Sequence, residues 1–508
     1  MIGKLIDTKG FMCYNFFIKP QGRKNKLNEA KTGKHYVGIK EIALYGVANG
    51  GQVMGYNLVR GQLTFFLVTV CRIPAAAVAT MVLIMGTWDT LNDPLMGSIV
   101  DRTRTRYGKL RPYLIFVPIP LSIVTILLFS GGELLKDVTS TAIKILFMYV
   151  AYFLWEFFYT IGDIPFWGLS AAISPNPEDR SRAITSARFI SGIIGGIVGI
   201  LIPVMIDLSN NKIVNITLSQ IFLIMGIVAG TVGTFLFSLS GICTKERVVQ
   251  STKEDGLFTV FRCLKNNKPL LLIVISSVLS TLGGIGGVFS QYYYIYSLGF
   301  ASLSLLAGVP GTIVNFATYM IIPKIEKRFS SKRIVIYCGL INAAVGAVIF
   351  ALGSGFYTNP KVIVPLLALQ GIFTSFTSAI GSVVPTKMIG DTVDYMEWKT
   401  GERNEGITFS FLTFIAKLTG SFSTAIATTI MPIIGLQSIN DEWQLVESGV
   451  NTRFWLWALI TIIPPVLNLL SLVPYAFYDL TGKKLETIQE EIGERRREKS
   501  IEVSGGND

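Results

Sequence analysis

The stretch AAAVATMVLIMGTWDTLNDP, residues 75–94, decides how this chain can fold. Its uncharged part leads into Asp89 and Asp93, which stand four positions apart. Four residues make slightly more than one helical turn, so both carboxylates share a helix face, with Asn92 beside them. Two carboxylates this close stay ionised together only when a cation lies between them. The pair therefore predicts a site for Na⁺ or H⁺, unless the acids only form salt bridges with arginines near the helix end.

The rest of the chain repeats such uncharged runs. Half of the 508 residues are hydrophobic and only 15% are charged, and the mean hydropathy is +0.52. An apolar helix of about 20 residues crosses a bilayer. The sequence therefore predicts an all-α polytopic membrane protein rather than a large soluble α/β protein. Twelve spans are expected: 43–70, 74–100, 111–131, 142–173, 183–207, 213–240, 269–298, 301–323, 334–355, 361–389, 405–435 and 452–478.

The positive charge is distributed as in membrane proteins. In a soluble protein, a net charge of +12 and a pI of about 9.3 would indicate nucleic-acid binding. Here the basic residues gather in alternate loops, the pattern of loops that stay in the cytoplasm. They include Arg102, Arg104, Arg106, Lys109 and Arg111 after the second span, and Lys324, Lys327, Arg328, Lys332 and Arg333 after the eighth. The alternation predicts a multi-pass protein of the cell membrane with both termini cytoplasmic and no nucleic-acid partner.

The predicted spans fall into two halves. Six spans occupy 42–241 and six occupy 269–480, separated by a charged cytosolic loop at 242–268. Residues 1–41 lack the apolar core of a signal peptide and are expected to form a cytosolic extension, and 481–508 a cytosolic tail. In both halves, the second span leads through a basic cluster into the third. Six-plus-six spans are typical of the major facilitator fold, although any cytosolic loop tends to be basic.

A second polar group lies in WEFFYTIGDIPFW, residues 155–167. Glu156, Thr160 and Asp163 follow at i, i+4 and i+7, and Trp167 continues the same helix face. Charged groups in a bilayer are costly and are usually functional. A carboxylate accepts hydroxyl hydrogen bonds and an indole stacks on the apolar face of a sugar ring, so Asp163 and Trp167 together favour a sugar site. Alone, Trp167 would be read as lipid-facing packing.

Three other charges are single within their spans. Arg188 lies near the start of the fifth span, where its side chain could reach the cytosol. Lys417 lies about twelve residues into the eleventh span, too deep for that. Arg60 lies in the middle of the first span.

Four long motifs carry a family resemblance. WDTLNDPLMGSIVDRTRTRYGKLRPY (88–113), YTIGDIPFWGLS (159–170), GDTVDYMEWKTGERNEG (390–406) and FYDLTGKKLETIQEE (477–491) resemble the glycoside–pentoside–hexuronide:cation symporters, the group that includes the melibiose permease. The likeness runs in order from about residue 42 to 490. It implies the major facilitator fold with twelve transmembrane helices and alternating access.

The resemblance also implies roles for individual residues. Asp89, Asn92 and Asp93 match the family's cation ligands, with Thr160 added from the fourth helix. Asp163, Trp167 and Arg188 match sugar-contacting positions, and Lys417 matches a lysine near both sites. The implied cargo is a sugar with Na⁺, H⁺ or Li⁺ as the coupling ion, without a cofactor or a metal beyond that ion. The protein is expected to function as a monomer in the lipid bilayer.

The first span departs from the family pattern. Some sugar-carrying members have an acid there, whereas YGVANGGQVMGYN (45–57) has Gln52 and Val53 at that place. Arg60 and Glu156 match no family position. Both are expected at the same depth, and we predict that they pair across the outer part of the cavity. The pair would be a latch or gate; alternatively, Arg60 holds the carboxylate of a uronide substrate.

Two other functions remain open at this point. A membrane-embedded enzyme would need a catalytic constellation, but the only histidine is His35 and no HExxH, GxSxG or phosphate-binding loop occurs. A lipid-moving relative would favour a cavity without the Asp163–Trp167 pair. The sequence favours a cation-coupled importer of a glycoside, oligosaccharide or uronide.

Overall fold

The computed structural model describes residues 35–248, 267–401, 405–439, 442–445, 451–482, 484–492 and 494. The expected cytosolic extension up to residue 34 and most of the middle loop lie outside the described residues. The first half contains α2 (Ile39–Phe65), η2 (Phe66–Val70), α3 (Ala75–Arg102), α4 (Arg111–Phe116), α5 (Pro118–Leu134), α6 (Thr141–Ala172), α7 (Pro177–Asn210), α8 (Leu218–Val228), η3 (Ala229–Gly233) and α9 (Thr234–Cys243). The second contains α11 (Lys268–Ser280), η4 (Thr281–Gly284), α12 (Ile285–Tyr296), α13 (Leu303–Glu326), α14 (Ser331–Gly353), α15 (Pro360–Thr400), α16 (Glu405–Ile433), α17 (Thr452–Thr461), α18 (Ile463–Leu469) and α19 (Leu472–Ala476).

The predicted all-α membrane architecture is confirmed, with one small addition. Among the described residues, seven helices are long and apolar enough to span a membrane, and the bent pair Thr452–Thr461 with Ile463–Ala476 makes eight. The other long segments, α2, α3, α4–α5 and α16, are consistent with the twelve expected spans. The addition is a hairpin of β1 (Leu436–Ile439) and β2 (Glu442–Leu445), in which Leu436 pairs with Leu445. It lies where the sequence predicted a simple loop.

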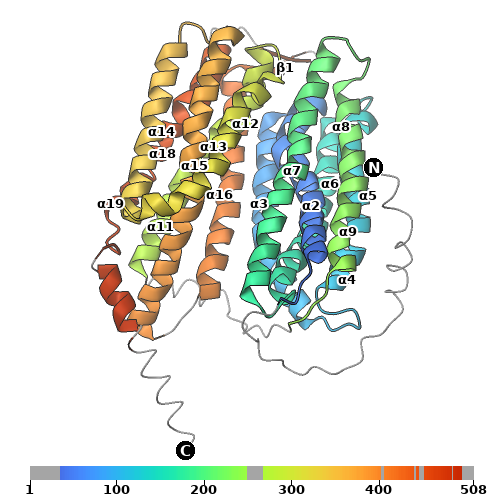
Figure 1. Ribbon diagram of the computed structural model, residues 1–508. Helices are drawn as coiled ribbons and strands as arrows, with labels where there is room; N and C mark the ends of the chain where they lie inside the picture. The colour runs from blue at the N-terminus through green and yellow to red at the C-terminus, as the bar shows by residue number, and fades with distance from the viewer. Residues whose placement is uncertain are drawn as a thin grey trace, which may run out of the picture.

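The helices form two bundles that stand side by side with nearly parallel axes (Figure 1). Helices α2–α9 form one bundle and α11–α19 the other, and α3 faces α16 across the boundary. Glycine permits this approach, because a Cβ on Gly86 would lie 1.8 Å from Oγ of Ser421. Inside the first bundle, a Cβ on Gly51 would lie 2.3 Å from the carbonyl oxygen of Gly233. Small residues of this kind let membrane helices pack closely where lipid supplies no hydrophobic driving force.

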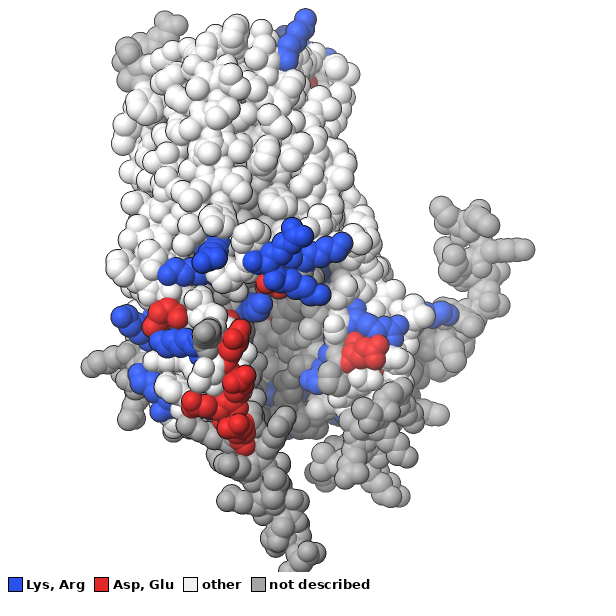
Figure 2. All heavy atoms as spheres, turned by 60° about the vertical axis from the view of Figure 1, so that its left-hand side comes forward, with Lys and Arg blue, Asp and Glu red and all other residues white. Residues whose placement is uncertain are grey.

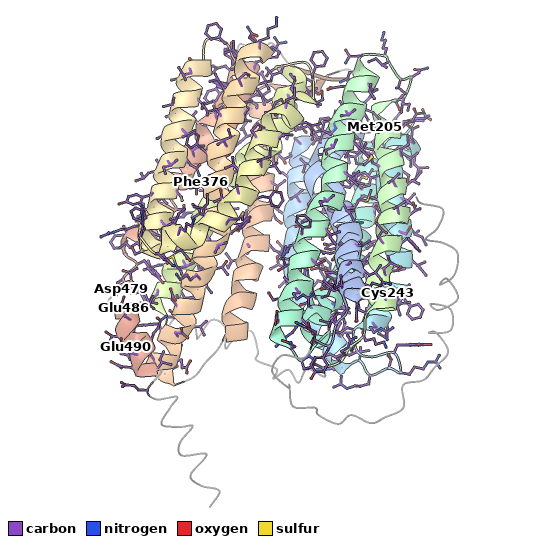
Figure 3. The ribbon with its side chains drawn as sticks, in the orientation of Figure 1. Met205, Cys243, Phe376, Asp479, Glu486 and Glu490 are labelled. Carbon is purple, nitrogen blue, oxygen red and sulfur yellow. The ribbon has the colours of Figure 1, made fainter. Side chains whose placement is uncertain are left out.

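The outer surface of the bundles is apolar over most of its height. Figure 2 shows uncoloured side chains over the upper part and lysines and arginines gathered toward the lower end. Large exposed apolar side chains face outward from several helices: Ile119, Ile123, Leu146, Phe189, Ile193, Ile313, Met320 and Val348. Lipid can cover such a surface, whereas water cannot do so without cost. Cys243, Glu486 and Glu490 lie at the basic end and Met205 toward the opposite end (Figure 3).

Carboxylates organise the basic end of the first bundle. Glu246 accepts hydrogen bonds from the backbone N–H groups of Lys109, Leu110 and Arg111 at 2.8–2.9 Å, where α4 begins. A helix N-terminus favours an anion because its first N–H groups have no partner within the helix. Glu41 of α2 forms an ion pair with Arg247 at 2.8 Å. These contacts tie the start of the middle loop to the helices of its own bundle.

The two bundles are joined at the other end through Asp207 of α7. Its buried carboxylate accepts hydrogen bonds from the backbone N–H groups of Ala301 and Ser302, both at 2.7 Å, just before α13 begins. Nearby, the ring of Phe65 meets that of Tyr292 edge-on, with centroids 5.4 Å apart. Because Phe65 ends α2 and Asp207 lies near the end of α7, these contacts join the two bundles at the end opposite the basic loops.

We expect Asp207→Ala to open this end. The two hydrogen bonds to this charged group contribute about 1.5–3 kcal/mol each, so their loss should shift the closed-to-open ratio by about two to four decades. The measurement is labelling of Thr64→Cys, on a cysteine-free background, by a membrane-impermeant maleimide in intact cells. Ser302→Ala is the matched control, because it keeps the backbone N–H and should label like the parent. Equal labelling of Asp207→Ala and the parent would contradict the closing role.

Candidate functional site

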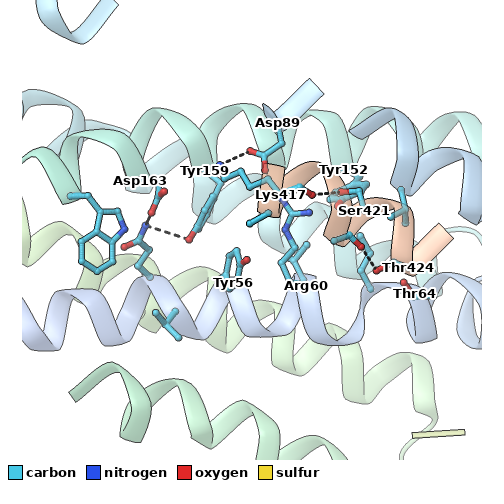
Figure 4. A pocket seen from close by; sticks show the side chains of 18 of the residues that line it. Tyr56, Arg60, Thr64, Asp89, Tyr152, Tyr159, Asp163, Lys417, Ser421 and Thr424 are labelled. Carbon is cyan, nitrogen blue, oxygen red and sulfur yellow. Dashed lines mark hydrogen bonds and ion pairs between the residues drawn. The ribbon is translucent and has the colours of Figure 1, made fainter. Parts of the chain in front are cut away.

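A cavity of about 490 Å³ lies between the two bundles. Its size is within the range of small-molecule sites, about 300–1,000 Å³. Figure 4 shows Asp163 toward one end, Thr64 and Thr424 toward the other, and the charged groups between them. The cavity is lined by Asn49, Gln52, Val53, Tyr56, Val59, Arg60, Leu63, Thr64, Val82, Asp89, Tyr152, Tyr159, Asp163, Trp167, Arg188, Ala416, Lys417, Gly420, Ser421 and Thr424.

The acid pair of α3 holds a cation from the opposite bundle. Nζ of Lys417, on α16, lies 2.5 Å from Oδ2 of Asp93 and 3.5 Å from Oδ1 of Asp89. The hydroxyl of Thr160, on α6, donates to Oδ1 of Asp89 at 3.2 Å. Asp89, Asp93, Thr160 and Lys417, which the sequence assigned to neighbouring roles, thus lie together. The alternative of a salt bridge with arginines at the helix end does not describe this arrangement.

Asn92 stands apart from this group. Its side chain is buried, and its Nδ2 has no hydrogen-bond partner. It is absent from the residues that line the cavity. Three positions separate it from Asp89, about 300° of rotation, so its side chain lies about 60° from that of Asp89 around the helix axis. Asn92 therefore makes no hydrogen bond to the acid pair through its Nδ2, and its role as a cation ligand stays a prediction.

Arg60 and Glu156 pair, as the sequence predicted. Nη2 of Arg60 lies 3.0 Å from Oε1 of Glu156. The same nitrogen also donates to Oδ2 of Asp89 at 2.9 Å, a contact that the sequence did not predict. Glu156 is fully buried behind Arg60, while Arg60 itself lines the cavity. Arg60 therefore links the unmatched acid of α6 to the acid pair of α3.

The predicted sugar-binding residues gather at the other end of the cavity. Nε2 of Gln52 donates to Oδ1 of Asp163 at 2.6 Å, so an amide of α2 meets the carboxylate of α6. Oε1 of Gln52 is buried without a hydrogen-bond partner. The guanidinium of Arg188 lies 4.6 Å from the ring centroid of Trp167. Arg188 thus points into the cavity and stacks on Trp167 rather than reaching for the cytosol.

Sequence reasoning missed several polar and aromatic residues of the lining. On α2, Asn49, Tyr56 and Thr64 continue the face of Gln52 and Arg60, and on α6, Tyr152 and Tyr159 continue the face of Glu156 and Asp163. Ser421 and Thr424 follow Lys417 at i+4 and i+7. Helical spacing from the charged residues was the available signal, because residues three, four and seven apart share a face.

Comparisons with known proteins identify the family. Residues 44–482 match the model of a family described as MFS/sugar transport protein. The chain belongs to this family. An uncharacterised symporter of Bacillus subtilis is 28% identical over 93% of this chain and 98% of its own length. The isoprimeverose transporter of Lactiplantibacillus pentosus is 26% identical over 90% of this chain and 92% of its own.

The fold agrees as well. A crystal structure of the nucleoside transporter NupG covers 86% of this chain and 98% of its own at a TM-score of 0.55 and 14% sequence identity, a likeness of fold. The family predicted from the four motifs is thereby confirmed, and the chain is a secondary active sugar transporter of the major facilitator superfamily. Membership of a transporter family excludes the membrane-embedded enzyme considered above.

The contact between α3 and α16 yields a prediction. A side chain at Gly86 would collide with Ser421, so Gly86→Leu should push the two helices apart and stop transport. The expected result is a longer distance between spin labels at the exposed positions 95 and 422, together with loss of sugar uptake. Gly97→Leu, on the same helix with open space around it, is the control. An unchanged distance in Gly86→Leu would show that the close approach is not required.

Proposed function

We propose that this protein imports a sugar together with a monovalent cation by alternating access. The observation that carries the proposal is the position of Lys417, whose amino group from one bundle lies between the two carboxylates of the other. Asp89, Asp93 and Thr160 supply hard oxygen ligands that suit Na⁺, Li⁺ or a proton. A cation on these oxygens would change the charge that Lys417 faces and so change the contact between the bundles.

The sugar is proposed to bind beside this site, at Asp163, Trp167 and Arg188. Asp163 offers acceptors for sugar hydroxyls, and the free Oε1 of Gln52 offers another. Aromatic side chains nearby supply stacking surfaces. The relatives named symporter and isoprimeverose transporter support a sugar cargo and a coupling ion for this chain.

The placement in the cell follows from the same reasoning. We propose that the basic end faces the cytoplasm, that both termini lie there, and that the protein works as a monomer in the cell membrane. The end closed by Asp207 would then face outward. This orientation makes the described arrangement one in which the sugar site is shielded from the outside.

Coupling is tested by removing one carboxylate. Asp93→Asn should abolish uphill uptake driven by an inward Na⁺, Li⁺ or proton gradient in proteoliposomes, because the amide cannot balance a cation. A panel of radiolabelled neutral and acidic glycosides, each assayed in Na⁺ and K⁺ buffers, identifies the cargo and the ion. Glu133→Gln, which removes an acid outside the cavity, is the control. Full cation-driven accumulation by Asp93→Asn would end the ion-site assignment.

The sugar site is tested by binding. Asp163→Asn should weaken sugar affinity by about one to two decades, the equivalent of losing about 1.5–3 kcal/mol for hydrogen bonds to a charged group. Isothermal titration calorimetry on the purified protein measures this at saturating cation. The effect should persist in every cation, unlike that of Asp93→Asn. Wild-type affinity in Asp163→Asn and Arg188→Ala together would place the sugar elsewhere.

A further inference from the structure

The side chains around Arg60 form an incomplete ion pair. Its Nη2 is shared between Asp89, at 2.9 Å, and Glu156, where it donates to Oε2 at 3.1 Å. At the same time, Nε of Arg60 and Oε1 of Glu156 are both buried without a hydrogen bond of their own. A guanidinium and a carboxylate usually meet through two parallel hydrogen bonds. Oε1 lies 3.0 Å from Nη2 as an ion pair but accepts no hydrogen bond, so a second arrangement could join it to the unused donor Nε.

The charges of this group do not balance. Asp89, Asp93 and Glu156 are linked to Arg60 and Lys417 in one chain of contacts. With every carboxylate ionised, the group carries one more negative than positive charge. An uncompensated charge away from water is costly, so the group has a place for one further monovalent cation or proton. Asp89 is the point of entry, because it lines the cavity whereas Glu156 does not.

Arg60 obstructs that point of entry. Oδ2 of Asp89 already accepts from Arg60, and Oδ1 from Thr160 and Lys417. A cation can take Asp89 as a ligand only if positive charge moves away from it. Among the described residues, Lys417 forms ion pairs only with Asp89 and Asp93, so it has no acid outside the proposed cation site to move to. Arg60 has one, in Glu156.

We propose that Arg60 is an internal competitor of the coupling cation and that Glu156 is the carboxylate that receives it. In this structure, Arg60 neutralises Asp89. When the cation binds Asp89 and Asp93, Arg60 turns onto Glu156 and completes the two-bond pair through its free Nε. This inference rests on the proposed cation site and adds two residues that set how tightly that site holds its ion. Glu156 is thus a positioning residue that acts through Arg60.

The test measures the ion rather than the sugar. Full-length protein in lipid nanodiscs is titrated with NaCl, LiCl and protons against a choline background, and the rise in Tm gives the midpoint for each ion. The ion that stabilises the wild type is then used for all variants. Glu156→Gln deprives Arg60 of its second partner, so the midpoint should move to about tenfold higher ion concentration. The double variant Arg60→Gln/Glu156→Gln removes competitor and receiver together and should bind the ion at least as tightly as wild type.

The outcomes separate this inference from the proposed function. In one outcome, Asp93→Asn loses the ion response, while Glu156→Gln and the double variant keep the wild-type midpoint. This outcome would overturn the role of Arg60 but leave the cation site in place. A wild-type response in Asp93→Asn, or no ion response in the wild type, would overturn the cation site and this inference with it. A purely structural role for Glu156 predicts that the double variant binds the ion as weakly as Glu156→Gln; that result also overturns the proposal. If Glu156→Gln does not fold, the double variant still decides, because a midpoint higher than wild type contradicts competition. Glu133→Gln, at the exposed pair with Lys136, should leave the midpoint unchanged.

Discussion

The need to balance buried charge within a bilayer governs the centre of this protein. Three carboxylates on α3 and α6 and two cations on α2 and α16 lie in a single chain of ion pairs, and no member can lose its partners cheaply. Because the members come from both bundles, the charge balance also sets how closely the bundles approach. The glycine contact between α3 and α16 makes that approach sterically possible. The ion pairs and the packing of α3 against α16 therefore depend on each other.

The cavity divides its tasks along its length. At one end, Gln52, Asp163, Trp167 and Arg188 present hydrogen-bonding groups and an aromatic face, as a sugar requires. In the middle, ion pairs dominate. The two regions share helices α2 and α6, so a change in the side chains of one is carried along the same helix faces to the other. The proposed sugar and ion sites would therefore share the same two helices, so coupling between them would need no long-range pathway.

Much of the site could be predicted from sequence, for physical reasons that also set the limit. Helical periodicity placed Asp89 with Asp93, and Glu156 with Asp163, and equal depth predicted the meeting of Arg60 with Glu156. Periodicity does not predict contacts between helices that are remote in sequence. The position of Lys417 near the acid pair was therefore predicted only from the family resemblance, and the hydrogen bond from Arg60 to Asp89 was not predicted. The role of Asn92 beside the acid pair stays a prediction, because its buried Nδ2 makes no hydrogen bond. The hairpin of β1 and β2 and the partners of Asp207, Ala301 and Ser302, lie in connecting segments without such a period.

The contact of Asp207 with the other bundle has an evolutionary consequence. Asp207 is held by main-chain N–H groups, not by a complementary side chain. Residue 302 could therefore become almost anything except proline, which has no N–H, without disturbing the contact. Homologues that retain this closure should keep an acid at position 207 while its partner position drifts freely. A search for co-varying residue pairs would overlook such a contact, because only the acid at position 207, and not its backbone partner, constrains the sequence.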